Sequence, residues 1–105
     1  MKLTLEQVLQ SGIKAHKAGK AQEADRYYTA ILKVDPKHPD ANHNMGVLAV
    51  GVGKIQDGIP FFKAALEANP KIEQFWMSYI DALIKLGRVD EAKVVCDQAK
   101  SHGPR

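Results

Sequence analysis

Hydrophobic residues along this chain recur three and four positions apart, and glycine and proline break this spacing at regular intervals. Near the C-terminal end, for example, the apolar side chains are Phe75, Trp76, Tyr79, Leu83 and Leu86. Such spacing places side chains on one face of an α-helix, so it predicts an amphipathic helix. The same pattern predicts helices near residues 4–18, 21–34, 40–52, 56–68, 72–86 and 88–101.

The breaks between these helices return every 34 residues. The glycines are Gly19, Gly53 and Gly87, and the prolines are Pro36, Pro70 and Pro104. Each glycine opens a similar hexamer, GKAQEA, GKIQDG or GRVDEA. A glycine can adopt positive φ at the end of one helix, and the acid four residues later suits the positive N-terminal end of the next. The pattern predicts an all-α fold, one domain over 1–105 with repeats at 5–38, 39–72 and 73–105.

Two residues are expected to disturb this pattern. Pro60 costs about 3 kcal/mol inside a helix, so we expect it near the first turn of a fourth helix that begins late. Gly51 is about 1 kcal/mol less favourable than alanine in a helix, so it should either bend the third helix or make room for a neighbour.

The stretch GVLAVGVGK at residues 46–54 looks at first like a phosphate-binding loop. That motif requires glycine five residues before the second glycine and a hydroxyl after the lysine, because backbone amides surround the phosphates and the hydroxyl binds magnesium. Here the two positions hold Leu48 and Ile55. Gly53 and Lys54 instead form the second copy of the repeated turn, so no nucleotide site is predicted.

Composition excludes several other classes. The 15 basic and 12 acidic residues leave a charge of only +3, and the basic residues are dispersed, so we expect no nucleic acid partner. The longest apolar run, residues 45–52, is far shorter than the roughly 18 residues that cross a bilayer, so we expect no membrane partner. The N-terminus lacks the apolar core of a signal peptide, and Cys96 is the single cysteine, which together favour a cytoplasmic location.

A 34-residue helical hairpin that ends in proline resembles the tetratricopeptide repeat, whose pattern is W-x2-L-G-x2-Y, then A-x3-F, then P. The matching residues are Gly12, Ala24, Tyr28 and Pro36, then Met45, Gly46, Phe62 and Pro70, then Trp76, Ala92 and Pro104. The third unit departs most, since Tyr79 and Ile80 replace Leu-Gly and Cys96 replaces the aromatic residue, and its helices are expected to cross more widely. The resemblance implies a right-handed superhelix (α-solenoid) whose first helices line a concave groove.

By this resemblance, the groove binds a peptide or helix of a protein partner. The candidate binding residues are Leu9, Gln10, Ile13, His16, His43, Asn44, Val47, Met77, Ser78 and Asp81. Gln10, Asn44 and Ser78 share one repeat position, so they predict a row of hydrogen-bonding groups similar to the asparagine ladder of O-linked N-acetylglucosamine transferases. The alternative for the apolar members is that they pack neighbouring first helices together.

Other chemistry is not predicted. The positions that grip chaperone tails in some tetratricopeptide proteins hold Leu9, Ile13, Asn44, Gln74 and Ser78, so the cations are missing and no binding of such tails is expected. His16 and His43 lack a third ligand for a metal, and no cofactor is expected. Cys96 occupies a core position, as do Tyr27, Tyr28, Phe61 and Phe62, and Asp81 has no acid-base companion. The chain is therefore predicted not to be an enzyme.

Two further hypotheses remain. WMSYIDALIKLGRVDEA at residues 76–92 resembles a repeat of bacterial tetratricopeptide proteins, some of which carry a downstream glycosyltransferase region, so the chain could select substrates for a larger enzyme. A homo-oligomer through an uncapped C-terminal repeat is the other, because solenoid ends normally need a polar cap. In that case Phe75 and Tyr79 are expected to be unsheltered.

Overall fold

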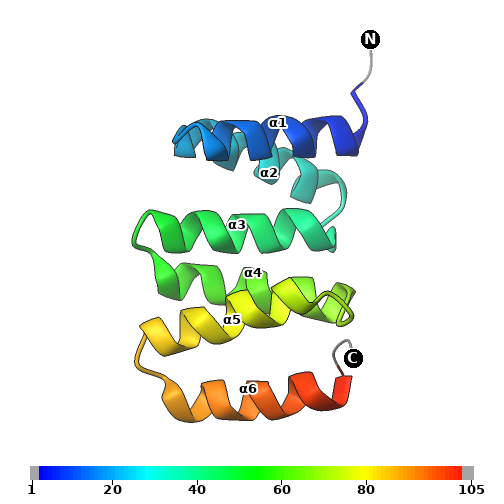
Figure 1. Ribbon diagram of the computed structural model, residues 1–105. Helices are drawn as coiled ribbons and strands as arrows, with labels where there is room; N and C mark the ends of the chain where they lie inside the picture. The colour runs from blue at the N-terminus through cyan, green and yellow to red at the C-terminus, as the bar shows by residue number, and fades with distance from the viewer. Residues whose placement is uncertain (1–2, 103–105) are drawn as a thin grey trace.

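The computed structural model describes residues 3–102, and within them the chain forms six α-helices and no β-strand. These are α1 (Leu5–Lys17), α2 (Ala21–Val34), α3 (Pro39–Gly51), α4 (Ile55–Ala68), α5 (Glu73–Lys85) and α6 (Val89–His102). They pair into three antiparallel hairpins that follow one another along the long axis of a body measuring 47 × 27 × 20 Å (Figure 1). The predicted all-α superhelix of hairpins is confirmed, while Pro104 lies outside the described residues.

The turn inside each hairpin is built in the same way. Gly19, Gly53 and Gly87 have φ values of 78°, 82° and 76°, which side chains rarely adopt. The N–H of the next residue then donates back to a carbonyl five residues earlier, as in Lys54 N to Ala49 O at 2.8 Å. This bond satisfies a carbonyl at the end of the first helix. The acids predicted for the next helix, Glu23, Asp57 and Glu91, all lie in its first turn.

The connections between hairpins also repeat. The side chains of Asp35 and Asn69 accept backbone N–H bonds two residues on, at 3.2 and 3.1 Å, and so form equivalent turns around the prolines. One residue of the following helix then closes each connection: Asn42 Nδ2 donates to Pro36 O at 3.0 Å, and Trp76 Nε1 donates to Pro70 O at 2.7 Å. Asn42 and Trp76 stand 34 residues apart, so different side chains perform the same task.

The two helices of a hairpin meet where glycine lies under an aromatic ring. A Cβ atom on Gly46 would stand 2.6 Å from the Phe62 ring, and one on Gly12 would stand 2.6 Å from Tyr28. Both rings are fully buried, as predicted. In the third hairpin Ile80 and Cys96 take these two positions, and α5 and α6 pack less closely than α3 and α4. Cys96 is half-buried rather than a core residue, and within residues 3–102 no further helix follows α6 to cover it.

Residues between hairpins complete the core. Phe75 and Tyr79 are only 3% and 7% exposed, because they point back toward α4 rather than toward the open end of the stack. The prediction that they would be unsheltered is wrong. Tyr27, predicted to be a core residue, is 37% exposed, because Tyr28 fills the core and Tyr27 stands at the edge of the contact between α1 and α2.

Neither Pro60 nor Gly51 affects its helix in the way predicted. Pro60 lies inside α4, which begins at Ile55 and not late as predicted. Pro60 is exposed, whereas Ile59 and Phe62 on the other face are buried, so core packing holds a helix that has lost one backbone bond on its solvent side. Gly51 is the last residue of α3, and a Cβ atom there would meet nothing within 4 Å, so this glycine makes room for no neighbour.

Two glycines of α3 provide a matched test of this packing. We expect Gly46→Ala to lower the free energy of unfolding by about 1–3 kcal/mol, because the new methyl group overlaps the buried Phe62 ring. We expect Gly51→Ala to leave stability unchanged or raise it by up to about 1 kcal/mol, because the site is open and alanine favours the helix. Urea unfolding followed by circular dichroism measures both. Equal effects of the two substitutions would contradict the close helix contact.

Candidate functional site

The ten predicted binding residues lie on α1, α3 and α5, the first helix of each hairpin. Gln10, Met77 and Asp81 are exposed, and Ile13, His16, Asn44, Val47 and Ser78 are half-buried. Leu9 and His43 are buried, at 3% and 8% exposed. The face therefore combines accessible polar groups with apolar groups that are partly occupied by packing within the chain.

One repeat position shows how neighbouring hairpins determine exposure. Leu9, His43 and Met77 are equivalent, yet Met77 is 55% exposed. Leu9 belongs to the core cluster that spans α1 to α3, and the His43 ring stacks on Phe75 of α5 with centroids 4.8 Å apart. Met77 has no following first helix against it within the described chain. Leu9 therefore packs neighbouring helices together, as the alternative interpretation predicted. Met77 is the most accessible of the three side chains.

A hydrogen-bond network joins α3 to α5 at the centre of this face. His43 Nε2 lies 2.8 Å from Ser78 Oγ, and His43 Nδ1 lies 3.3 Å from Asn44 Oδ1. An amide oxygen only accepts, so Nδ1 carries the proton and Nε2 accepts from the Ser78 hydroxyl. Gln74 Nε2 also donates to Ser78 Oγ, at 3.2 Å. Burial lowers the pKa of His43, against the opposing effects of the Asn44 hydrogen bond and the Asp40 carboxylate.

This serine–histidine pair has the spacing of a nucleophile and its base, but its setting is different. Ser78 lies inside α5, where backbone N–H groups donate along the helix and are not free to bind a developing oxyanion. The Ser78 hydroxyl also holds two neighbours, His43 and Gln74. The network is suited to fixing α5 against α3 and not to acyl transfer.

Gln10, Asn44 and Ser78 stand at equivalent positions of α1, α3 and α5, and each has a hydrogen-bond partner within the chain. Gln10 Nε2 donates to Glu6 Oε2 at 2.8 Å, and Ser78 belongs to the histidine network. Asn44 accepts from His43 through Oδ1. Among the described residues, no hydrogen-bond acceptor lies against its Nδ2 group. Asn44 is therefore the member of the row best placed to donate to a ligand.

The other candidates are held by local contacts. Ile13 and Val47 each pack against a core cluster, in agreement with the packing alternative. His16 Nδ1 lies 3.3 Å from the hydroxyl of Tyr28, whose pKa is raised by burial. Asp81 pairs with Lys85 at 3.0 Å, and both side chains are well exposed, so this ion pair adds little stability.

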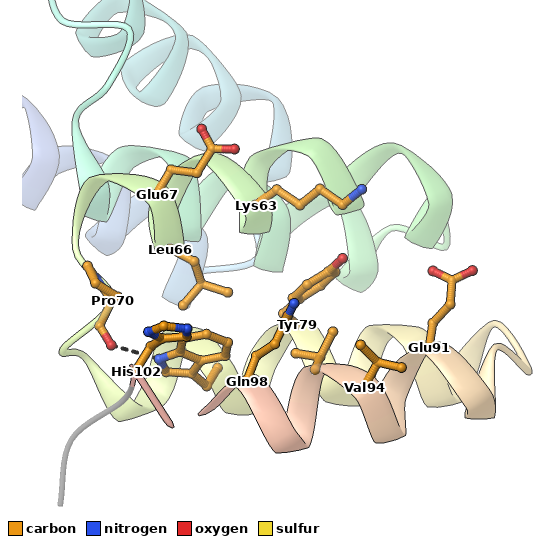
Figure 2. A pocket seen from close by; sticks show the side chains of 11 residues that line it. Lys63, Leu66, Glu67, Pro70, Tyr79, Glu91, Val94, Gln98 and His102 are labelled. Carbon is orange, nitrogen blue, oxygen red and sulfur yellow. Dashed lines mark hydrogen bonds between the residues drawn. The ribbon is translucent and has the colours of Figure 1, made fainter. Parts of the chain in front are cut away.

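Sequence reasoning missed a groove of about 640 Å³ on the other side of the stack, between α4, α5 and α6 (Figure 2). Its apolar part includes Leu66, Tyr79 and Val94, and Lys63 and Glu91 lie at its edge (Figure 2). Burial raises the pKa of Tyr79, and the nearby Glu91 carboxylate adds to this effect. Trp76 also lines the groove, and its N–H is already bound to Pro70 O.

A second groove of about 520 Å³ lies one hairpin earlier, between α2, α3 and α4. Met45 occupies the place of Tyr79 there, and Asp57 the place of Glu91. Because the groove recurs with different side chains, it follows from the spacing of successive second helices. The repeated period of the sequence could have predicted it, although not its depth.

Two further properties bear on function. Within residues 3–102, no group of three or more histidine, cysteine or acidic side chains is arranged to hold a metal ion. None of the described helices combines the length and the apolar character that a bilayer crossing requires.

Comparison with known proteins gives one family match. A family model described as "Tetratricopeptide repeat" matches residues 49–105. Among curated proteins, trafficking protein particle complex subunit 12 of Homo sapiens is 35% identical over 49 residues, and that of Mus musculus is 33% identical over 49 residues. These matches cover 47% of this chain but only 7% and 6% of the two relatives.

Solved structures resemble the whole described stack. MamA AMB-1 superposes with a TM-score of 0.79 at 18% identity, covering 93% of this chain and 54% of that protein. A MamA D159K mutant superposes with a TM-score of 0.78 at 18% identity, covering 93% of this chain and 57% of the other. At this level of identity the likeness concerns the fold alone. The chain spans little more than half of these structures and a small part of the curated relatives.

The buried His43 predicts a pH dependence of stability. The pKa of His43 is lower in the folded chain than the usual 6.5, so the unfolded chain binds this proton first. Above about pH 7 we expect His43 to have no effect on how the free energy of unfolding varies with pH. Below pH 6.5 we expect the free energy of unfolding to fall as the pH approaches the pKa that His43 has in the folded chain. Urea midpoints at pH 7.5 and pH 5 measure the loss, and His43→Gln should reduce it. An identical pH profile in this variant would contradict the assignment.

Proposed function

Because the repeat model matches more than half of the chain, the chain belongs to the tetratricopeptide repeat family, and we propose that it is a non-catalytic protein-interaction module. The observation that carries this proposal is the shared face of α1, α3 and α5, where equivalent positions hold accessible amide and hydroxyl groups beside accessible apolar groups. Repeat proteins commonly bind partners on such extended faces. In this proposal the face binds a peptide or short helix of a protein partner.

In this proposal, the exposure of each residue determines its role in binding. Asn44 supplies an amide donor to a peptide carbonyl, and Gln10 extends the polar row toward α1. Met77 supplies a flexible apolar contact that adapts to varied side chains. His43 acts from beneath, because its bonds to Asn44 and Ser78 fix the direction of both side chains.

The curated relatives support a role in assembly, since their shared name describes a subunit of a trafficking protein particle complex. Their aligned part is short, so this chain's own partner is not transferred from that name. No relative compared above is named as a glycosyltransferase. The support for a substrate-selecting role is therefore limited to the sequence resemblance of residues 76–92. A cytoplasmic location is part of the proposal, as the setting that the single cysteine favours.

Site-specific photo-crosslinking tests which face binds. We expect a crosslinking amino acid at Met77 or Gln10 to capture a partner from a lysate of the source organism, because these exposed positions lie on the first-helix face. The matched control positions are Gln22 and Lys33, which are exposed on α2, a second helix of a hairpin. We expect no capture of the same partner there.

The captured partner then allows a binding measurement. We expect Asn44→Ala to weaken its affinity about five- to twelvefold, the effect of losing one hydrogen bond of about 1–1.5 kcal/mol, while circular dichroism is unchanged. Gln22→Ala should bind as the wild type does. Capture from α2 alone, or equal affinity of Asn44→Ala and wild type, would reject the first-helix face as the site.

A further inference from the structure

Within residues 3–102, no helix follows α6, and the face between α5 and α6 is accessible. We call it the C-terminal face; it is defined by Ile80, Ile84, Val89, Lys93, Cys96 and Lys100, and it forms a groove of about 420 Å³. Ile84 and Val89 are 52% and 49% exposed. This face is separate from the first-helix face and lies across α5 from its polar row.

The preceding hairpin shows which kind of element covers such a face. The residues 34 positions before Ile84 and Val89 are Val50 and Ile55, and both are half-buried against the core cluster that includes Phe75, Tyr79 and Leu83 of α5. The element that covers the equivalent face is therefore a single α-helix, seated between the two helices of a hairpin. An α-helix is the shape that fits the C-terminal face.

Charge distinguishes the C-terminal face from its covered equivalent. Lys93 and Lys100 stand 34 residues after Ile59 and Leu66, which are 3% and 9% exposed. Two cations thus occupy positions that a seated helix would contact. Asp97 also lines the groove, but its equivalent Lys63 is exposed in the covered hairpin, so Asp97 lies at the rim. An occupant would meet an apolar centre flanked by positive charge.

A second copy of the chain does not match this face. Stacked head to tail, it would present the residues of α1 equivalent to the buried Phe75, Tyr79 and Ala82 of α5. These are Gln7, Ser11 and Lys14, of which Gln7 and Lys14 are exposed and Ser11 is half-buried. Polar groups would cover the apolar centre, and Lys14 would add a like charge beside the two lysines.

We propose that the C-terminal face docks an amphipathic α-helix of a partner protein, whose apolar stripe covers Ile84 and Val89 and whose acidic side chains pair with Lys93 and Lys100. This interaction is independent of the peptide bound on the first-helix face. The apolar centre supplies affinity, and the two lysines select acidic helices over basic ones.

Two stapled helical peptides test the proposal. Both carry the apolar residues of α5 at their original spacing, Phe75, Tyr79, Ala82 and Leu83, and they differ only in having glutamate or lysine at the positions beside this stripe. Fluorescence anisotropy measures their affinity for the chain at low salt. We expect the acidic peptide to bind at least roughly fivefold more tightly, as two exposed ion pairs allow, and to lose this advantage in 0.5 M salt.

Variants of exposed residues give the controls. The double substitution Lys93→Glu and Lys100→Glu should reverse the preference, Ile84→Asp should abolish binding of both peptides, and Asn44→Ala on the first-helix face should leave both affinities unchanged. Circular dichroism verifies that each variant folds. The proposal is overturned if the two peptides bind equally, or if neither binds, in which case the lysines form a solubilising cap. It is also overturned if light scattering shows a dimer that Ile84→Asp dissociates, since a second copy would then cover the face.

Discussion

Each hairpin of this chain can bury its apolar residues only against its own partner helix and the hairpins beside it, and most features of the molecule follow from this constraint. Phe75 and Tyr79 are buried because the second hairpin precedes them, and the His43 ring is buried because α5 follows it. In the first two hairpins the contact between the helices is set by a glycine beneath an aromatic ring, as with Gly46 and Phe62. Stability is thus a sum of similar local terms, and no central core has to form at once.

This constraint explains why the fold could be predicted from the sequence. The turns inside the hairpins need glycine at positive φ, so glycine recurs at the 34-residue period whatever the surrounding side chains are, and proline recurs at the same period. The predicted helix starts lie within one residue of the observed ones, and only the late start expected for the fourth helix is wrong. Pro60 has an unfavourable local propensity, but the burial of Ile59 and Phe62 on the opposite face decides the structure there, and sequence spacing does not weigh these two energies.

For the candidate site, the sequence could predict which first-helix residues are equivalent but not how deeply each is buried. Leu9, His43 and Met77 are equivalent positions on the first helices, but they differ widely in exposure because each has a different neighbour. The link between His43 and Ser78 was also missed, since it joins residues 35 positions apart and depends on the Phe75 ring that holds the imidazole. A repeated sequence states which residues are equivalent, while the hairpin that follows determines which of them remain accessible.

The two proposed surfaces meet on α5, and the packing of that helix indicates that they act independently. One side of α5 is fixed to the preceding hairpin by buried aromatic residues and by the Ser78–His43 bond. Its other side carries Ile84, which contributes to none of these contacts and is half exposed. A helix seated on Ile84 would therefore add to the stack without changing the interactions that direct Asn44 and Ser78. Because coupling between sites requires a ligand to favour one arrangement of a shared element, and α5 is already held in one arrangement from the other side, binding at the two surfaces is expected to be additive.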